Sequence, residues 1–95
     1  VISDYHPLEK PEGISPNGDA LNDQFVIHNL GKYPVNHLTI FNRWGNVVYE
    51  QHNYLNDWKG ENLKGDLLPE GTYFVVLRID EADITLKGYV EIRYK

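Results

Sequence analysis

Cysteine and methionine are both missing from the 95 residues of this chain. Without cysteine it has no disulfide, no thiolate ligand for a metal and no cysteine nucleophile. The chain begins at Val1, and its opening residues lack the basic and apolar regions of a signal peptide, so we expect a processed product or a fragment of a longer protein. No apolar run approaches the roughly 20 residues that a membrane-spanning helix needs.

Basic charge and nucleophilic side chains are also scarce. Nine lysine and arginine residues stand against fourteen acidic ones, a net charge of -5, so nucleic acid and anionic membranes are poor partners. The only serines are Ser3 and Ser15, and neither lies in a G-x-S-x-G motif. The four histidines are dispersed without H-E-x-x-H spacing, which favours ordinary surface or strand positions over a zinc site. We therefore do not expect an enzyme.

What is present is typical of a β protein with many turns. Aromatic residues make up 13% of the chain, with seven tyrosines, eight glycines and five prolines. The length allows one small domain, residues 1–95, and we find no internal repeat. Segments rich in β-branched and aromatic residues predict strands at 25–28, 37–42, 46–50, 72–79 and 84–94. A short strand within 54–58, with Trp58 packed over the core, and a weak one at 2–6 give about seven. We predict an all-β fold, an immunoglobulin-like antiparallel β-sandwich.

Local patterns refine this prediction at three points. Gly45-Asn46 is typical of a two-residue hairpin connection, because both residues tolerate a positive φ. Gly88 lies on the apolar row of the last strand, which indicates a bulge or the close approach of a bulky neighbour. Tyr73 begins a long central strand, where a tyrosine-corner hydrogen bond is expected.

The stretch "ISPNGDALNDQF", residues 14–25, concentrates turn formers and oxygen ligands. Hard oxygen ligands suit Ca²⁺, and those of this loop are Asn17, Asp19, Asn22 and Asp23. The EF-hand pattern fails, however, because no glutamate occupies the closing position. We favour a loop whose asparagine and aspartate side chains bond nearby backbone amides, while Pro16 and Gly18 set the turn. Calcium binding is the alternative.

"IFNRWGNVVYE", residues 40–50, places Arg43 and Trp44 at a hairpin tip. These residue types anchor protein interfaces and stack on sugar rings. Together with Tyr54 and Trp58 they would suit a carbohydrate-binding module of an extracellular protein, and a passive spacer or adhesion module is a further alternative. The competing interpretation is structural: both indoles cap the ends of the sandwich and shield its small core.

Five motifs occur in an order that resembles a known family. The ordered set is a closer match to that family than any single motif. The five motifs are "ISPNGDALNDQF", "YPVNHLTIFNRWGNVVYE", "YLNDWKG", "LPEGTYFVVL" and "LKGYVEIRY". Together they resemble the gliding-motility-associated C-terminal domain of Bacteroidota, the type B sorting domain of the type IX secretion system. The resemblance runs from about Ile14 to residue 95, and departs from the family at Ala20, where glycine is usual, and at Lys59, where aspartate or asparagine is usual.

The resemblance implies an immunoglobulin-like domain at the extreme C-terminus of large exported proteins, which acts as a sorting signal and not as a catalyst. Its implied partners are the type IX translocon, outer-membrane shuttle proteins and the upstream cargo domains of the same chain. The implied location is the periplasm in transit and then the cell surface or the medium of a Gram-negative bacterium. The motif positions carried over are Asn17, Gly18, Asp19, Asn22, Asp23, Arg43, Trp44, Gly45, Trp58, Gly60, Gly71 and Tyr73.

Overall fold

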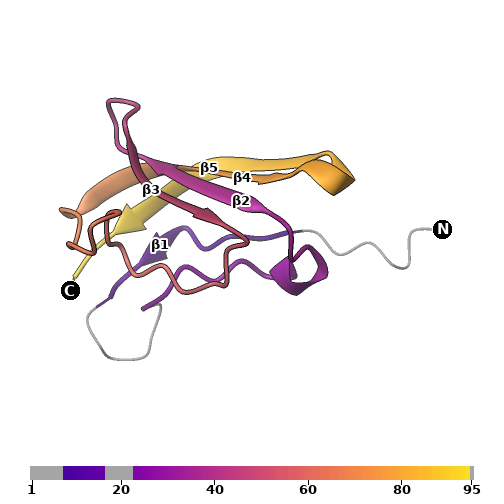
Figure 1. The fold of residues 1–95 in the computed structure, drawn as a ribbon. Coiled ribbons are helices and arrows are strands. Elements are labelled where there is room, and N and C mark those ends of the chain that lie inside the picture. Colours follow the sequence, from indigo (N-terminus) through magenta and orange to yellow (C-terminus); the bar gives the residue numbers. More distant parts are fainter. Residues whose placement is uncertain (1–7, 17–22, 95) are drawn as a thin grey trace.

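A computed structural model describes residues 8–16 and 23–94 of the chain. These residues form five strands and two short 3₁₀ turns, without an α-helix, which confirms the all-β class. The strands are β1 (Gly13–Ile14), β2 (His37–Phe41), β3 (Val47–His52), β4 (Gly71–Ile79) and β5 (Ile84–Ile92), and the turns are η1 (Leu30–Lys32) and η2 (Asp80–Ala82). All five strands join one sheet in the order β1-β5-β4-β2-β3 (Figure 1). Only the β1–β5 pair of this sheet is parallel.

The two longest strands show why the sheet has one buried and one open face. Alternate residues of β4, from Tyr73 to Ile79, are buried, while Thr72 and Arg78 are exposed. This is the period of two expected of a half-buried strand. On β5 the apolar row predicted from the sequence also faces the core. Gly88 interrupts this row because the Lys10 side chain crosses it, where a Cβ would clash, and the Lys10 ammonium donates to the Tyr89 carbonyl at 2.6 Å.

The second layer is made of irregular backbone rather than a second sheet. Segments before β2 and between β3 and β4 lie below the sheet in Figure 1 and bury Phe25, Ile27, Tyr54 and Trp58 against it. Asparagine side chains form hydrogen bonds with backbone N–H groups of these segments. For example, Asn36 Oδ1 accepts the Tyr54 N–H at 2.9 Å. The layer is therefore fixed by side-chain amides and aromatic packing instead of a strand ladder.

The expected count of seven strands is wrong for the part of the chain that the structure describes. Segment 25–28 pairs only at His28, which forms a bridge with Glu9, and 54–58 is not a strand. The physical reason is the hydrogen bonding of these segments: the Ile27 N–H donates to Asn56 Oδ1 and the Phe25 N–H to the Trp58 carbonyl, both at 2.9 Å. The strand predicted at 2–6 lies outside the described residues.

Candidate functional site

The hairpin between β2 and β3 projects from one end of the sheet (Figure 1). Its connection has three residues, Arg43 to Gly45, and not the two predicted. The Gly45 N–H donates to the Asn42 carbonyl, and the Asn42 N–H to the Asn46 carbonyl, at 2.9 Å each. Of the two residues expected to have a positive φ, only Gly45 does, at 83°. A turn followed by one left-handed residue is a common three-residue hairpin loop.

The Asn42 side chain stiffens this loop from within. Its Oδ1 accepts the backbone N–H of Trp44 and that of Asn46, both at 3.0 Å. The Trp44 indole is 72% exposed, and the Arg43 guanidinium carbon lies 4.5 Å from the centre of its ring. The tip thus presents an exposed indole and a stacked cation on a backbone that is already ordered, which lowers the entropy lost on binding.

A second loop, between β3 and β4, has the same hydrogen bonds as the hairpin tip. In residues 62–66 the Gly65 N–H donates to the Asn62 carbonyl at 2.9 Å, and the Asn62 N–H to the Asp66 carbonyl at 2.7 Å. The Asn62 Oδ1 accepts the N–H groups of Lys64 and Asp66 at 2.9 and 3.0 Å, and Gly65 has a φ of 90°. The shared sequence signal is an asparagine three residues before a glycine.

Trp58 and Tyr54 lie inside the core, exposed by only 0% and 2%. The Tyr54 hydroxyl donates to the Phe25 carbonyl at 2.6 Å and accepts the Trp58 N–H at 2.9 Å. The Trp58 indole N–H donates to the Glu61 carbonyl at 2.7 Å. The prediction that Trp58 packs over the core is confirmed. The prediction that Trp44, Tyr54 and Trp58 form a platform for a carbohydrate is wrong, because of these three side chains only Trp44 is exposed. The capping interpretation holds for Trp58 and fails for Trp44.

Other motif positions also support the fold. The Tyr73 hydroxyl donates to the Pro69 carbonyl at 2.8 Å, which confirms the tyrosine corner, and burial raises the pKa of this phenol. Gly60 has a φ of 86° and lies against Ile92 in the core. Beside it, the Lys59 N–H donates to Glu61 Oε1 at 2.7 Å, so the Glu61 side chain stabilises this turn. Gly71, at the start of β4, has a φ of 151°.

The oxygen-rich loop stays a prediction. Of its motif positions, Asn17, Gly18, Asp19 and Asn22 lie outside the described residues, and Asp23 is half-buried just before the core residue Phe25. Within residues 8–16 and 23–94, no group of three or more histidine or acidic side chains could hold a metal ion. No helix among these residues is long and apolar enough to span a membrane.

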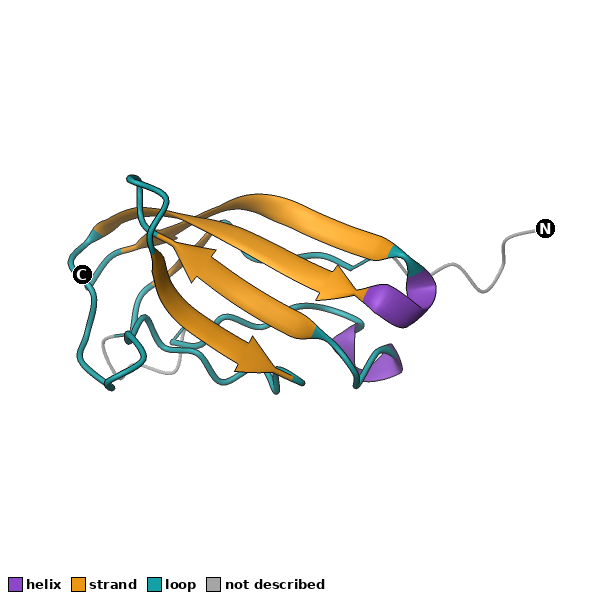
Figure 2. Cartoon of the chain, turned by 45° about the horizontal axis from the view of Figure 1, so that its top comes forward, coloured by secondary structure: helices purple, strands orange, loops and turns teal. Residues whose placement is uncertain are grey.

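The outer face of the sheet carries a feature that was not predicted from the sequence. The register places Phe41 opposite Phe74, and Phe74 opposite Tyr89. Their ring centres lie 6.2 and 5.3 Å apart, and we call these three residues the aromatic row. Figure 2 looks onto this face, with the loops of the second layer behind the strands. The available signal was the aromatic residues Phe41, Phe74 and Tyr89 at strand positions that alternate with the buried ones.

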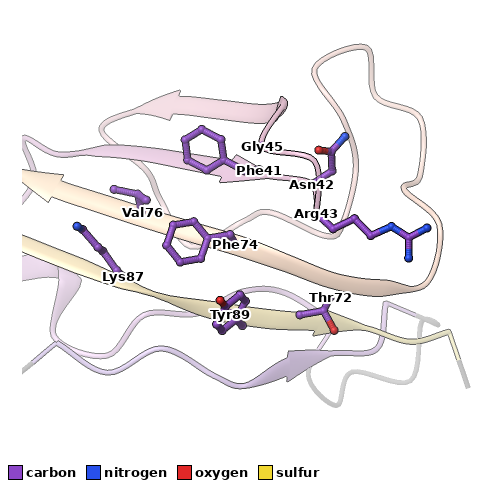
Figure 3. Close-up of a pocket in the computed structure, with 9 residues that line it drawn as sticks. All are labelled: Phe41, Asn42, Arg43, Gly45, Thr72, Phe74, Val76, Lys87 and Tyr89. Carbon is purple, nitrogen blue, oxygen red and sulfur yellow. The ribbon is translucent and has the colours of Figure 1, made fainter.

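The aromatic row lines an open groove of about 710 Å³ that reaches the hairpin tip (Figure 3). Val76 and Thr72 complete its floor, and Arg43 and Lys87 contribute its charges. A smaller hollow, between the hairpin tip and residues 69–73, shares Arg43 and Thr72 with the groove and adds Trp44. The exposed indole and the aromatic row are therefore parts of one continuous surface.

Comparison with known proteins assigns the chain to a family. Residues 8–92 match the family model of the CHU_C type IX secretion signal domain. A comparison with curated proteins finds no match. The family match covers most of the chain and includes the hairpin, the buried tryptophan motif and both long strands. The chain therefore belongs to the type IX secretion signal domain family, and it acts as a sorting signal by which a larger protein is exported across the outer membrane.

Proposed function

We propose that this domain is the C-terminal address of a larger Bacteroidota protein, carried from the periplasm to the type IX translocon with the help of outer-membrane shuttle proteins. After export the attached protein reaches the cell surface or the medium, and the domain has no catalytic activity of its own. The family match over residues 8–92 is the observation that carries the proposal.

Two groups of motif positions within the described residues differ in their surroundings, which guides the choice of contact residues. Trp58, Gly60 and Tyr73 are buried and support the fold. Arg43 and Trp44 are exposed and make no such contribution to the core. Because exposed aromatic and arginine side chains on ordered backbone are typical interface anchors, we propose that this pair contacts the export apparatus.

An export assay tests the proposal. The 95 residues are fused behind a periplasm-targeted fluorescent reporter and expressed in a gliding bacterium, with and without a working type IX system. We expect reporter outside the cell only when both the domain and the apparatus are present. A Trp44→Ala variant should be exported less, while Leu55→Ala, which changes another highly exposed apolar side chain, should behave like the unchanged domain.

Two results would contradict this proposal. Reporter that stays in the periplasm of the wild-type host would show that these residues are insufficient as a signal. Reporter that leaves the cell equally well without the apparatus would show that export does not depend on type IX secretion. Equal export of the Trp44→Ala and Leu55→Ala variants would leave the signal in place but remove the hairpin tip as its contact.

We also propose, from its composition, that the stretch at 14–25 is held by Asp19 and Asp23 through bonds to backbone amides, with Ca²⁺ as the alternative partner of the same carboxylates. Both Asp19→Ala and Asp23→Ala should lower the melting temperature. Melting curves in EDTA and in millimolar calcium separate the two arrangements, since only bound calcium makes the melting temperature depend on the cation. Unchanged melting in both variants would refute the role of the carboxylates.

A further inference from the structure

The outer face of the sheet is an apolar surface that the core does not use. The rings of Phe41 and Phe74 are half-buried, and Tyr89 is 64% exposed. With Trp44 at the adjoining hairpin tip, four aromatic side chains face the same region. Contiguous exposed apolar patches are uncommon on monomeric proteins, and those present often mark interaction sites.

We propose that this groove docks an acidic protein segment of the export apparatus, one that inserts an apolar side chain between the aromatic row and the hairpin tip. This inference rests on the proposed function and names the surface and the chemistry by which the signal is recognised. Trp44, Phe41, Phe74 and Tyr89 would form the apolar centre of the interface, and Arg43 and Lys87 its charged rim. An aromatic centre with a polar rim is the usual anatomy of a specific protein interface.

Charge complementarity argues for an acidic occupant. The chain carries a net charge of -5, yet the groove is lined by Arg43 and Lys87 and by no carboxylate. Of the acids nearby, Glu70 lines the smaller hollow, and its Oε2 accepts the Tyr94 N–H at 2.8 Å. Glu50 contacts His37 and Glu91 contacts Arg93, also at 2.8 Å each. Within the described part of the chain, neither of the two groove cations forms a salt bridge. The groove is thus a locally positive site on an acidic protein, which would steer an acidic partner towards it.

Ring geometry and charge disfavour the other occupants. Phe41 and Phe74 are inclined to each other by 43°, and Phe74 and Tyr89 by 59°, so the row offers side-chain-sized hollows rather than the flat platform on which a sugar ring would stack. A second copy of the domain, docked face to face on the same groove, would bring the same two cations towards each other. A protein segment with an apolar side chain beside carboxylates meets neither objection.

The loops at 42–46 and 62–66, which share their backbone hydrogen bonds, provide a matched control for the test. Arg43→Glu and Lys64→Glu each reverse one exposed charge in a loop with the same backbone hydrogen bonds, but only Arg43 lines the groove. Tyr89→Ala and Leu55→Ala each remove an exposed apolar side chain, and only Tyr89 belongs to the aromatic row. Since these side chains lie outside the core, all four variants should fold, and circular dichroism melts of the purified domains check this.

The first readout is export of the fluorescent reporter from the periplasm. We expect Arg43→Glu and Tyr89→Ala each to reduce it by about tenfold, the effect of losing one interface anchor, while the two control variants export normally. Failure of the unchanged domain would refute the proposed function itself. Normal export of Arg43→Glu and Tyr89→Ala by a system that exports the unchanged domain would overturn only the docking surface. An equal loss in Lys64→Glu would also overturn it, because the effect would then be one of total charge.

The second readout identifies the occupant. The photo-crosslinking residue p-benzoylphenylalanine is placed at position 89, or at position 55 as the control, in cells that export the fusion. We expect position 89 alone to yield a crosslinked envelope protein, whose crosslinked peptide carries aspartate or glutamate beside an apolar residue. A crosslink only to a second copy of the domain would overturn the proposal. So would retardation of the unchanged domain, but not of Tyr89→Ala, in an alginate-containing gel, combined with normal export of both.

Discussion

Tyr54 joins the two segments of the irregular layer, so Tyr54→Phe tests how that layer is held together. The hydroxyl donates to the Phe25 carbonyl at 2.6 Å and accepts the Trp58 N–H at 2.9 Å. Phenylalanine keeps the ring and removes only the oxygen. Both backbone groups then lose their partner in a site where the Tyr54 side chain is 2% exposed.

The cost follows from the two buried groups that are left unpaired. Each unsatisfied buried donor or acceptor costs about 1–3 kcal/mol, so we expect Tyr54→Phe to lower the free energy of unfolding by about 2–5 kcal/mol. In a domain of this size that corresponds to a melting temperature lower by about 10 °C or more. Tyr73→Phe removes a single bond, to the Pro69 carbonyl, and should cost only about 0.5–1.5 kcal/mol. Tyr89→Phe, at an exposed site, should change stability by less than about 0.5 kcal/mol.

Urea denaturation followed by tryptophan fluorescence measures these differences on the purified domain. All three variants exchange tyrosine for phenylalanine, so their different hydrogen bonding is the variable under test. We expect the midpoint concentrations to fall in the order Tyr89→Phe, Tyr73→Phe, Tyr54→Phe, with an unchanged denaturant slope. A Tyr54→Phe variant as stable as Tyr73→Phe would refute the reasoning, because it would mean that the irregular layer does not depend on this hydroxyl.

Three further predictions concern the same elements. Burial raises the pKa of Tyr54 above its ordinary value of 10, so the unfolded state loses this proton first and stability should fall as the pH rises above about 10. Urea titrations from pH 9 to 11.5 measure the free energy of unfolding, which should fall less steeply in Tyr54→Phe than in the unchanged domain. The two slopes should differ by at most about 1.4 kcal/mol per pH unit, the contribution of one titrating group. Gly45→Ala and Gly65→Ala should each cost about 1–2 kcal/mol, because both glycines have a left-handed φ with open space around the Cβ position. Unequal losses in thermal melts would contradict the equivalence of the two loops. Trp58→Ala should cost about 3–5 kcal/mol and Trp44→Ala less than about 0.5 kcal/mol, and similar losses would contradict their assignment to core and surface.

The composition of the sequence by itself determined where the long strands of the sheet lie. β2, β3, β4 and β5 occur where β-branched and aromatic residues are concentrated between turn signals, and along β5 apolar and polar residues also alternate, because one face of the sheet is buried. The ordered motifs likewise identified the family, since they combine turn residues and buried aromatics at fixed places. Trp58 in the core and the tyrosine corner at Tyr73 followed from the same local chemistry.

Only the tertiary structure decided what segments 25–28 and 54–58 become. Both have strand-like composition, but their backbone groups bond to Asn56, to Tyr54 and to each other instead of forming a ladder. The bonds that join the two segments to each other link residues distant in the sequence, so they leave no periodic signal. The same holds for the functional surface. Arg43 and Trp44 were recognised from the hairpin motif, whereas the aromatic row exists only because the register aligns three separate strands. Local patterns specify which residues are strands and turns, but the pairing of strands decides which side chains share a surface.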